Sequence, residues 1–149
     1  ITALKQNSDD RSRLLGRFGA EPTSVLFATD SFWEGVDTPG DALRVVIMCK
    51  LPFRVPNDPV LEARIEAIEQ AGGNPFYELS VPQAVMRLRQ GFGRLMRRAT
   101  DGGVVVVLDP RMVTRRYGTM FVESLPETGR AFTGRDRMID EIERFLYAP

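Results

Sequence analysis

The feature that most constrains the fold of this chain is a series of short apolar runs separated by segments with helical periodicity. Each run has the length of a single strand and is apolar almost throughout: Ser24–Thr29, Arg44–Cys49 and Gly103–Leu108. A fourth strand-like stretch, Ile1–Leu4, opens the chain. Continuous apolar strands are typical of parallel sheets that helices cover on both faces. The order therefore predicts an α/β fold, one domain over residues 1–149, with a parallel β-sheet flanked by helices.

Caps and apolar spacing predict the helices. The clearest is Asp58–Ala71, with Asp58 as its cap, Pro59 at the first position and Gly72–Gly73 at its end. The longest is Ser80–Arg98, whose first residues have the form of a capping box. Two further helical segments are expected: Asp9–Phe18, capped by Ser8 or Asp9, and the tail Met112–Pro149, clearest at Arg137–Tyr147.

The composition excludes several kinds of site. With 0 His and a single Cys, the chain has no Ser–His–Asp triad, no His-ligated metal and no internal disulfide. Cys49 lies in an apolar run, and we expect a buried, inert thiol there. No apolar run approaches the roughly 20 residues of a membrane span. A reducing, cytoplasmic compartment without a membrane partner is therefore expected.

The arginines are concentrated in the predicted helix Ser80–Arg98. The formal net charge of the chain is +0, yet Val81–Arg98 contains five arginines and no acidic residue. On a helical wheel, Arg87, Gln90, Arg94 and Arg97 fall within a sector of roughly 80°. The opposite side is apolar and could dock on the sheet: Val81, Val85, Leu88, Phe92 and Leu95. Guanidinium groups held in a row favour a polyanionic ligand. A solvated arginine-rich face is the alternative, although such faces normally mix both signs of charge.

Two glycines interrupt the same helix. Gly91 and Gly93 border the polar sector, and each costs a helix about 1 kcal/mol relative to alanine. Such a conflict between propensity and secondary structure often marks a functional site. We expect the glycines to let a phosphate chain or another backbone approach the arginines.

Two segments resemble known helicase motifs. Gln90–Arg97 resembles motif VI of superfamily 2 helicases, which has the pattern Gln or His, two residues, Gly–Arg, two residues, Arg. Phe27–Asp37 looks like motif V, with its Ala–Thr–Asp start and Gly–x–Asp end. Lys50–Pro59 and Tyr117–Phe121 resemble the DinG branch of the DinG/XPD helicases. The resemblance covers roughly Leu4–Pro126.

The resemblance implies a RecA-like second helicase domain of the P-loop NTPase type. Such enzymes close two RecA-like domains around ATP and Mg²⁺ while single-stranded DNA crosses both. Neither G-x-x-x-x-G-K-[ST] nor D-E-x-[HD] occurs in this chain, so the nucleotide and Mg²⁺ would be held mainly by the first RecA-like domain. We therefore expect a fragment of a larger enzyme, truncated at its N-terminus and inactive by itself.

The resemblance also assigns roles to single residues. Arg97 matches the main arginine finger, Arg94 its partner toward the γ-phosphate, and Gln90 the residue that organises the attacking water. In motif V, Asp37 matches the acid near the ribose, and the same loop contains Glu34 and Gly35.

Three further residues are candidates for contact with the nucleic acid. Thr29 matches a residue that often bonds a backbone phosphate. Phe32 and Trp33 either stack on bases or pack beneath the loop. Lys50 and Arg54 are weaker candidates for DNA contact.

Three functions are compatible with these motifs. The first is the motor half of an ATP-dependent DNA helicase, 5′-to-3′ by family resemblance. The second is a non-catalytic nucleic-acid-binding or partner-binding module derived from such a domain. The third, an RNA helicase, is disfavoured by the segment after Lys50.

Overall fold

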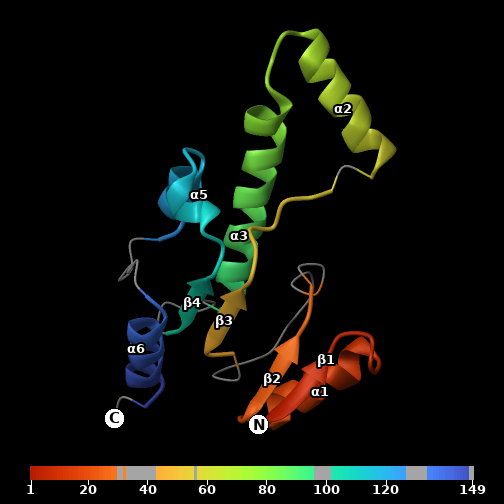
Figure 1. The fold of residues 1–149 in the computed structure, drawn as a ribbon. Helices are drawn as coiled ribbons and strands as arrows, with labels where there is room; N and C mark the ends of the chain where they lie inside the picture. The colour runs from red at the N-terminus through yellow and green to blue at the C-terminus, as the bar shows by residue number, and fades with distance from the viewer. Residues whose placement is uncertain (30–31, 33–42, 56, 96–101, 127–133, 148–149) are drawn as a thin grey trace. The chain divides into compact units, whose positions relative to one another are not determined.

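The structure is a computed structural model that describes residues 1–29, 32, 43–55, 57–95, 102–126 and 134–147, with the backbone alone at residues 94 and 95. Figure 1 shows its helices and strands with the labels used below. The chain divides into two compact units. The first consists of Ile1–Ile47, Gly91–Val106 and Glu127–Pro149, and the second of Met48–Gln90 and Val107–Pro126. The expectation of one domain over the whole chain stays a prediction.

The first unit is built around a parallel strand pair. β1 (Thr2–Lys5) pairs with β2 (Ser24–Phe27) in the register Leu4 to Leu26, and α1 (Arg11–Ala20) connects them. A parallel pair joined by a helix is the βαβ unit expected from the sequence. One face of the pair and one face of α1 enclose a small core of Leu4, Leu14 and Phe32, with Leu15, Phe18 and Leu26 partly buried against it.

The start of α1 differs from the prediction by one or two residues. The N-cap is Asp10, whose side chain accepts a hydrogen bond from the Ser12 N–H, and not Ser8 or Asp9. The Ser8 hydroxyl donates instead to the Lys5 carbonyl at 2.6 Å, across a turn in which Asn7 has a φ of 69°. Asparagine tolerates this left-handed conformation better than most residues. Because the Ser8 side chain bonds within this turn, the N-cap of α1 lies downstream, at Asp10.

The strands are less buried than continuous apolar runs predict. In β2, the side chain of Phe27 is 61% exposed, and Val25 is also exposed. Alternate strand residues face opposite sides, and Leu26 faces the core that α1 helps to enclose. Within the described part of the first unit, the expectation of burial on both faces of β2 is therefore wrong.

A second strand pair joins β3 (Val45–Met48) and β4 (Val104–Val107). The Val104 N–H donates to the Arg44 carbonyl and the Leu108 N–H to the Met48 carbonyl, both at 2.9 Å. Because the partners advance in the same direction, this pair is also parallel. The α/β class with parallel strands is confirmed.

Cys49 was expected to be buried in its apolar run, and this prediction is wrong. The strand β3 ends at Met48, which is buried, and Cys49 lies in the following bend with its thiol exposed. The run Arg44–Cys49 is thus one residue longer than the strand that it forms.

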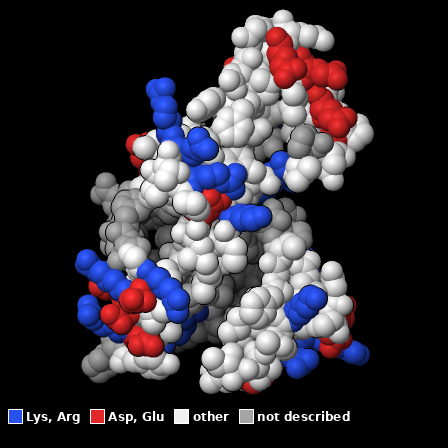
Figure 2. Space-filling view, viewed as in Figure 1, with Lys and Arg blue, Asp and Glu red and all other residues white. Residues whose placement is uncertain are grey.

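The helix predicted over Asp58–Ala71 is confirmed as α2 (Pro59–Gln70). The Asp58 side chain caps it by accepting from the Val60 N–H at 2.9 Å, and the helix is followed by Gly72 with a φ of 77°. No residue of α2 is buried. Acidic side chains gather over this helix in Figure 2. The glutamates Glu62, Glu66 and Glu69 of α2 are exposed.

The predicted capping box at Ser80 is wrong, because the long helix begins earlier. A π-helical turn, η3 (Phe76–Ser80), runs directly into α3 (Val81–Leu95). Asn74 caps this turn: its side chain accepts from the Phe76 N–H, and its own N–H donates to Glu78 at 2.7 Å. Pro82 has no N–H, and in a regular helix its ring would collide with the carbonyl four residues earlier. We attribute the wider turn before Pro82 to the need to relieve this conflict.

The C-terminal third is helical, as predicted. It contains α4 (Arg111–Thr114), α5 (Gly118–Ser124) and α6 (Arg135–Tyr147). In the second unit, α5 presents the buried Phe121, which lies 5.8 Å from the ring of Phe53. In the first unit, Arg44 donates to the Leu146 carbonyl at 3.0 Å, near the end of α6 where a cation is favourable. None of the helices in the described part of the chain could cross a membrane.

Candidate nucleotide and nucleic-acid interface

Helix α3 has the two-sided character that its sequence predicts. Val81, Ala84, Leu88 and Gly91 are buried and follow one another at helical spacing. Val85 and Phe92, on the predicted apolar side, are half-buried. Gln90 lies on another face and is exposed. The buried stripe fixes the helix, so that Gln90 is presented outward from a rigid element.

Arg87, the first arginine of the predicted row, forms a hydrogen bond within the second unit. Arg87 is half-buried, and its Nη1 donates to the carbonyl oxygen of the buried Pro52 at 3.3 Å. This bond uses one of the five N–H donors of a guanidinium. Arg94 lies in the last turn of α3, and Arg97 lies outside the described residues.

The two glycines of α3 lie in different surroundings. Gly91 belongs to the buried stripe. Gly93 is exposed, and a Cβ placed there would meet no atom within 4 Å among the described residues. The space needed for a close approach is therefore present at Gly93.

Thr29 lies at the edge where β1 and β2 both end. Its N–H and its hydroxyl donate to the side-chain oxygen of Gln6, at 2.7 Å and 3.0 Å. Gln6 directly follows β1, and its own N–H donates to the Phe27 carbonyl at 2.9 Å. Carboxyl ends of parallel strands are the usual place for ligands in α/β folds.

The ring of Phe32 is packed in the core of the first unit. It is only 5% exposed and belongs to the core cluster with Leu4 and Leu14. Of the two alternatives that the sequence left open for Phe32, the structure supports packing. A large apolar ring next to a small core gains more from burial than it would from exposure to solvent.

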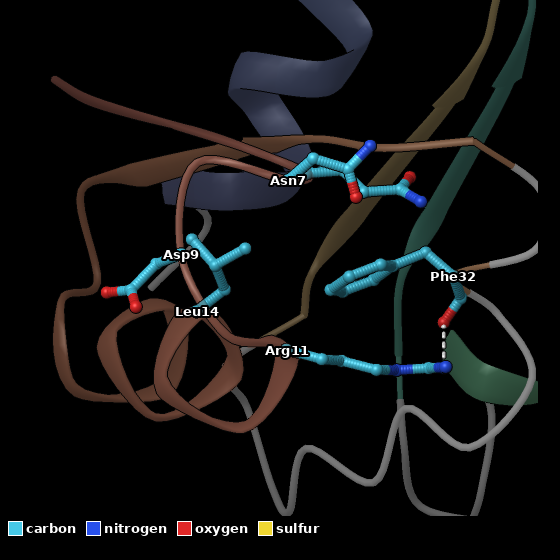
Figure 3. A pocket seen from close by; sticks show the side chains of 6 residues that line it. Asn7, Asp9, Arg11, Leu14 and Phe32 are labelled. Carbon is cyan, nitrogen blue, oxygen red and sulfur yellow. Dashed lines mark hydrogen bonds between the residues drawn. The ribbon is translucent and has the colours of Figure 1, made fainter.

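A shallow pocket opens beside this ring. Gln6, Asn7, Asp9, Arg11, Leu14 and Phe32 line it (Figure 3). Arg11, the first residue of α1, donates from Nη2 to the Phe32 carbonyl oxygen at 2.9 Å. Its guanidinium carbon lies 4.9 Å from the centre of the Phe32 ring, within the range of a cation–π contact.

The remaining predicted site residues lie outside the described residues: Trp33, Glu34, Gly35, Asp37 and Arg97. The structure therefore places Gln90, Thr29 and Phe32, together with the backbone of Arg94. Of the weaker candidates, Lys50 and Arg54 are exposed.

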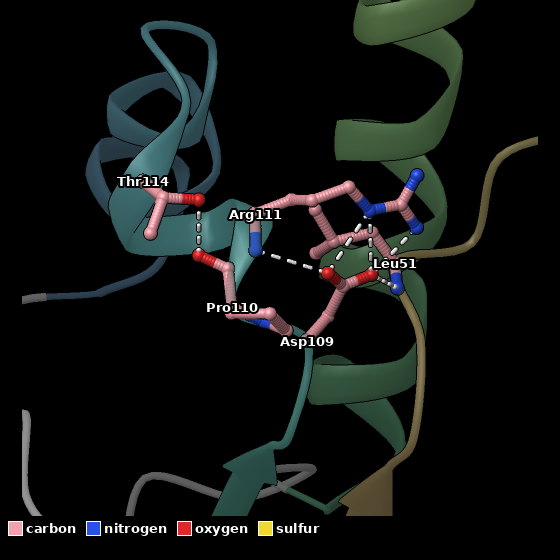
Figure 4. A network of polar contacts seen from close by, with 5 residues as sticks. All are labelled: Leu51, Asp109, Pro110, Arg111 and Thr114. Atoms are coloured by element: carbon pink, nitrogen blue, oxygen red, sulfur yellow. Dashed lines mark hydrogen bonds and ion pairs between the residues drawn. The ribbon is translucent and has the colours of Figure 1, made fainter.

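A polar network after β4 was not found from the sequence. Asp109, which is 5% exposed, accepts from the Leu51 N–H at 2.9 Å and forms an ion pair with Arg111 at 2.6 Å (Figure 4). The hydrogen bond from Arg111 is the main reason that the pKa of Asp109 lies well below its ordinary value, and the backbone N–H groups of Leu51 and Arg111 add to the shift. Burial acts in the opposite direction but is outweighed. The network joins the segment after β3 to the segment after β4. The sequence signal is an acidic residue placed directly after an apolar strand.

Comparisons with known proteins identify the family of this chain. A family model described as the helicase C-terminal domain matches residues 1–128. The chain is 47% identical over 146 residues to the ATP-dependent DNA helicase YoaA of Haemophilus influenzae, covering 98% of the chain and 22% of that protein. It is 47% identical over 123 residues to the ATP-dependent helicase DinG of Mycobacterium tuberculosis, covering 83% of the chain and 18% of that protein.

A third relative bears a different functional name. The chain is 44% identical over 116 residues to the 3′-5′ exonuclease DinG of Bacillus subtilis, covering 78% of the chain and 12% of that protein. The chain thus spans less than a quarter of the length of each of these relatives. The family match over most of the chain and the high identity confirm the resemblance seen in motifs V and VI. This chain belongs to the helicase C-terminal domain family, among relatives named DinG and YoaA.

Proposed function

We propose that this chain is the second motor domain of an ATP-dependent DNA helicase. It acts in the cytoplasm as part of a longer polypeptide whose first RecA-like domain holds ATP and Mg²⁺. Its family membership carries the proposal, because relatives that match most of the chain are named ATP-dependent helicases. The outward Gln90, opposite the buried stripe of α3, supports it.

In this proposal, the end of α3 completes the ATP site from the side of the second domain. Arg97 acts as the arginine finger on the γ-phosphate, Arg94 assists it, and Gln90 orients the attacking water. A finger of this kind raises the hydrolysis rate by about 10³–10⁵. The open space at Gly93 supports a close approach of the partner domain to this end of the helix.

The loop after β2 connects the nucleotide to the DNA. Asp37 acts near the ribose, and Glu34 and Gly35 act on the same loop at the domain interface. Thr29 and Trp33 contact single-stranded DNA. Because one loop contacts both ligands, ATP binding favours closure of the two domains, and hydrolysis releases it.

The finger is tested in the full-length protein by the variant Arg97→Ala. The expected result is a loss of about 10³-fold in single-strand-stimulated ATP hydrolysis, with ATP binding retained. The matched control is Arg116→Ala, since Arg116 is an exposed arginine outside the proposed site. An unchanged hydrolysis rate in Arg97→Ala contradicts the finger role.

Two further measurements separate the alternatives. The purified 149-residue chain is expected to hydrolyse no ATP, and measurable turnover would refute the division of the site between two domains. A full-length protein that binds single-stranded DNA without any DNA-stimulated ATP hydrolysis would favour the non-catalytic module.

A further inference from the structure

Two side chains upstream of the recognised motifs hold the start of the motif V loop. Gln6 follows β1, and Arg11 begins α1, so both lie near the carboxyl edge of the β1–β2 pair. Gln6 accepts both donors of Thr29, and Arg11 donates to the carbonyl of Phe32. Each contact joins residues more than 20 positions apart in the sequence.

The contacts fix the two ends of one short turn. The Phe32 N–H donates to the Thr29 carbonyl at 2.9 Å, which closes the turn between them. Gln6 fixes the first residue of this turn, and Arg11 fixes the last. The Phe32 ring is anchored in the core as well, so Phe32 is held by both its side chain and its backbone.

The anchoring residues are themselves held. The N–H of Gln6 continues the strand ladder by donating to Phe27, and the left-handed Asn7 closes the turn behind it. Arg11 begins a capped helix, and its guanidinium lies over the Phe32 ring. Side chains whose own positions are fixed are suited to positioning a functional loop.

We propose that Gln6 and Arg11 are positioning residues for the motif V loop. They set the positions of Thr29 and Phe32, which precede the remaining motif V residues in the chain. Gln6 acts through the N–H and the hydroxyl of Thr29, and Arg11 acts through the carbonyl of Phe32. This inference rests on the proposed function, because it concerns how that site is held.

The test compares Arg11→Ala with Arg13→Ala in the full-length protein. Arg13 lies on the same helix with its side chain 77% exposed, and its pair with Asp9 at 3.7 Å is a surface contact. Arg11→Ala is expected to raise the KM for ATP and the DNA concentration for half-maximal stimulation by about tenfold, the effect of losing one hydrogen bond from a charged group. The value of kcat at saturation should change much less, and Arg13→Ala should change none of these quantities.

Arg11→Lys, which keeps a charged donor, should restore part of the loss. Gln6→Ala should weaken the DNA stimulation more than it raises the KM for ATP.

A second readout does not depend on hydrolysis. Hydrogen–deuterium exchange of peptides covering residues 27–38 should be several-fold faster in Arg11→Ala than in the wild type or in Arg13→Ala. Unchanged exchange in these peptides overturns the inference, whatever the enzyme activity. A wild-type protein without DNA-stimulated ATP hydrolysis would refute the proposed function alone, since the exchange experiment still decides whether Arg11 holds the loop. If Arg11→Ala fails to fold, Gln6→Ala takes its place in the exchange experiment, and exchange of these peptides at the wild-type rate overturns the inference.

Discussion

Asp109 and Arg111 form an ion pair of 2.6 Å at the point where the chain leaves β4. The carboxylate is almost completely buried, whereas 41% of the Arg111 side chain remains exposed. The same carboxylate accepts from the backbone N–H groups of Leu51 and Arg111. One side chain therefore satisfies donors from two loops that follow different strands.

Removal of this carboxylate is expected to destabilise the protein. Asp109→Ala leaves the Leu51 N–H without its acceptor and breaks the ion pair. We expect a loss of about 1–3 kcal/mol in the free energy of unfolding, moderated by the solvent around Arg111. Urea denaturation measures this loss, with Asp140→Ala on the exposed surface of α6 as the control. Equal stability of the two variants would show that the network contributes nothing.

The same network predicts a pH dependence of stability. The folded-state pKa of Asp109 lies below its ordinary value of 3.8, so the folded state favours the ionised form. Its contribution is fully present above that ordinary value and is lost as the pH falls below about 4 toward the folded-state pKa. Urea midpoints measured between about pH 3 and 7 should fall more steeply on the acid side for the wild type than for Asp109→Asn. Identical slopes would contradict the assignment.

A glycine at the start of α5 is required by a close backbone approach. A Cβ on the buried Gly118 would collide with the carbonyl oxygen of Met112. Gly118→Ala is therefore expected to cost about 2 kcal/mol or more, because the connection between α4 and α5 would have to move. Gly16, in the middle of α1, has open space around a Cβ among the described residues, so Gly16→Ala should stabilise the protein by about 0.5–1 kcal/mol. Thermal unfolding of the two alanine variants should therefore shift in opposite directions, and a shift in the same direction would contradict this account.

The role of Phe32 can be separated from DNA contact by two substitutions. Phe32→Ala should cost about 3–5 kcal/mol, since it leaves a cavity beside Leu4 and Leu14. Phe32→Leu retains most of the buried volume and should leave affinity for single-stranded DNA within about twofold of the wild type. Affinity is measured with the full-length protein by anisotropy of a labelled strand. A large loss of affinity in a stably folded Phe32→Leu would restore the stacking alternative.

Local signals explain which parts of the fold the sequence predicts well. Both ends of α2 depend on residues at or beside the helix, namely Asp58, Pro59 and Gly72. The structure confirms both predicted ends. The start of α3 depends on a wider turn that accommodates Pro82, and no local sequence motif predicts such a turn. Phe27 and Cys49 are exposed because no other element that the structure describes covers them. A run of apolar residues in the sequence does not specify which elements will cover it.

The candidate site likewise contains residues that the sequence predicts and residues that it does not. Gln90 was predicted from its helical position and is exposed as expected, and its role in hydrolysis stays a prediction. Gln6 and Arg11 were missed because their partners lie more than 20 positions away in the sequence and are mostly backbone groups. Every residue has a backbone carbonyl, so a hydrogen bond between a side chain and a carbonyl produces no recognisable sequence motif.

Helix α2 holds none of the proposed site residues and buries none of its own. The chain thus contains a surface segment whose length can change without opening either core. An inserted module near Ala71 and Gly72 would interrupt no strand and no buried side chain, and exposed turns of this kind are where proteins accept whole inserted domains. Diversification of substrate or partner choice could begin at this segment while the rest of the domain stays as it is.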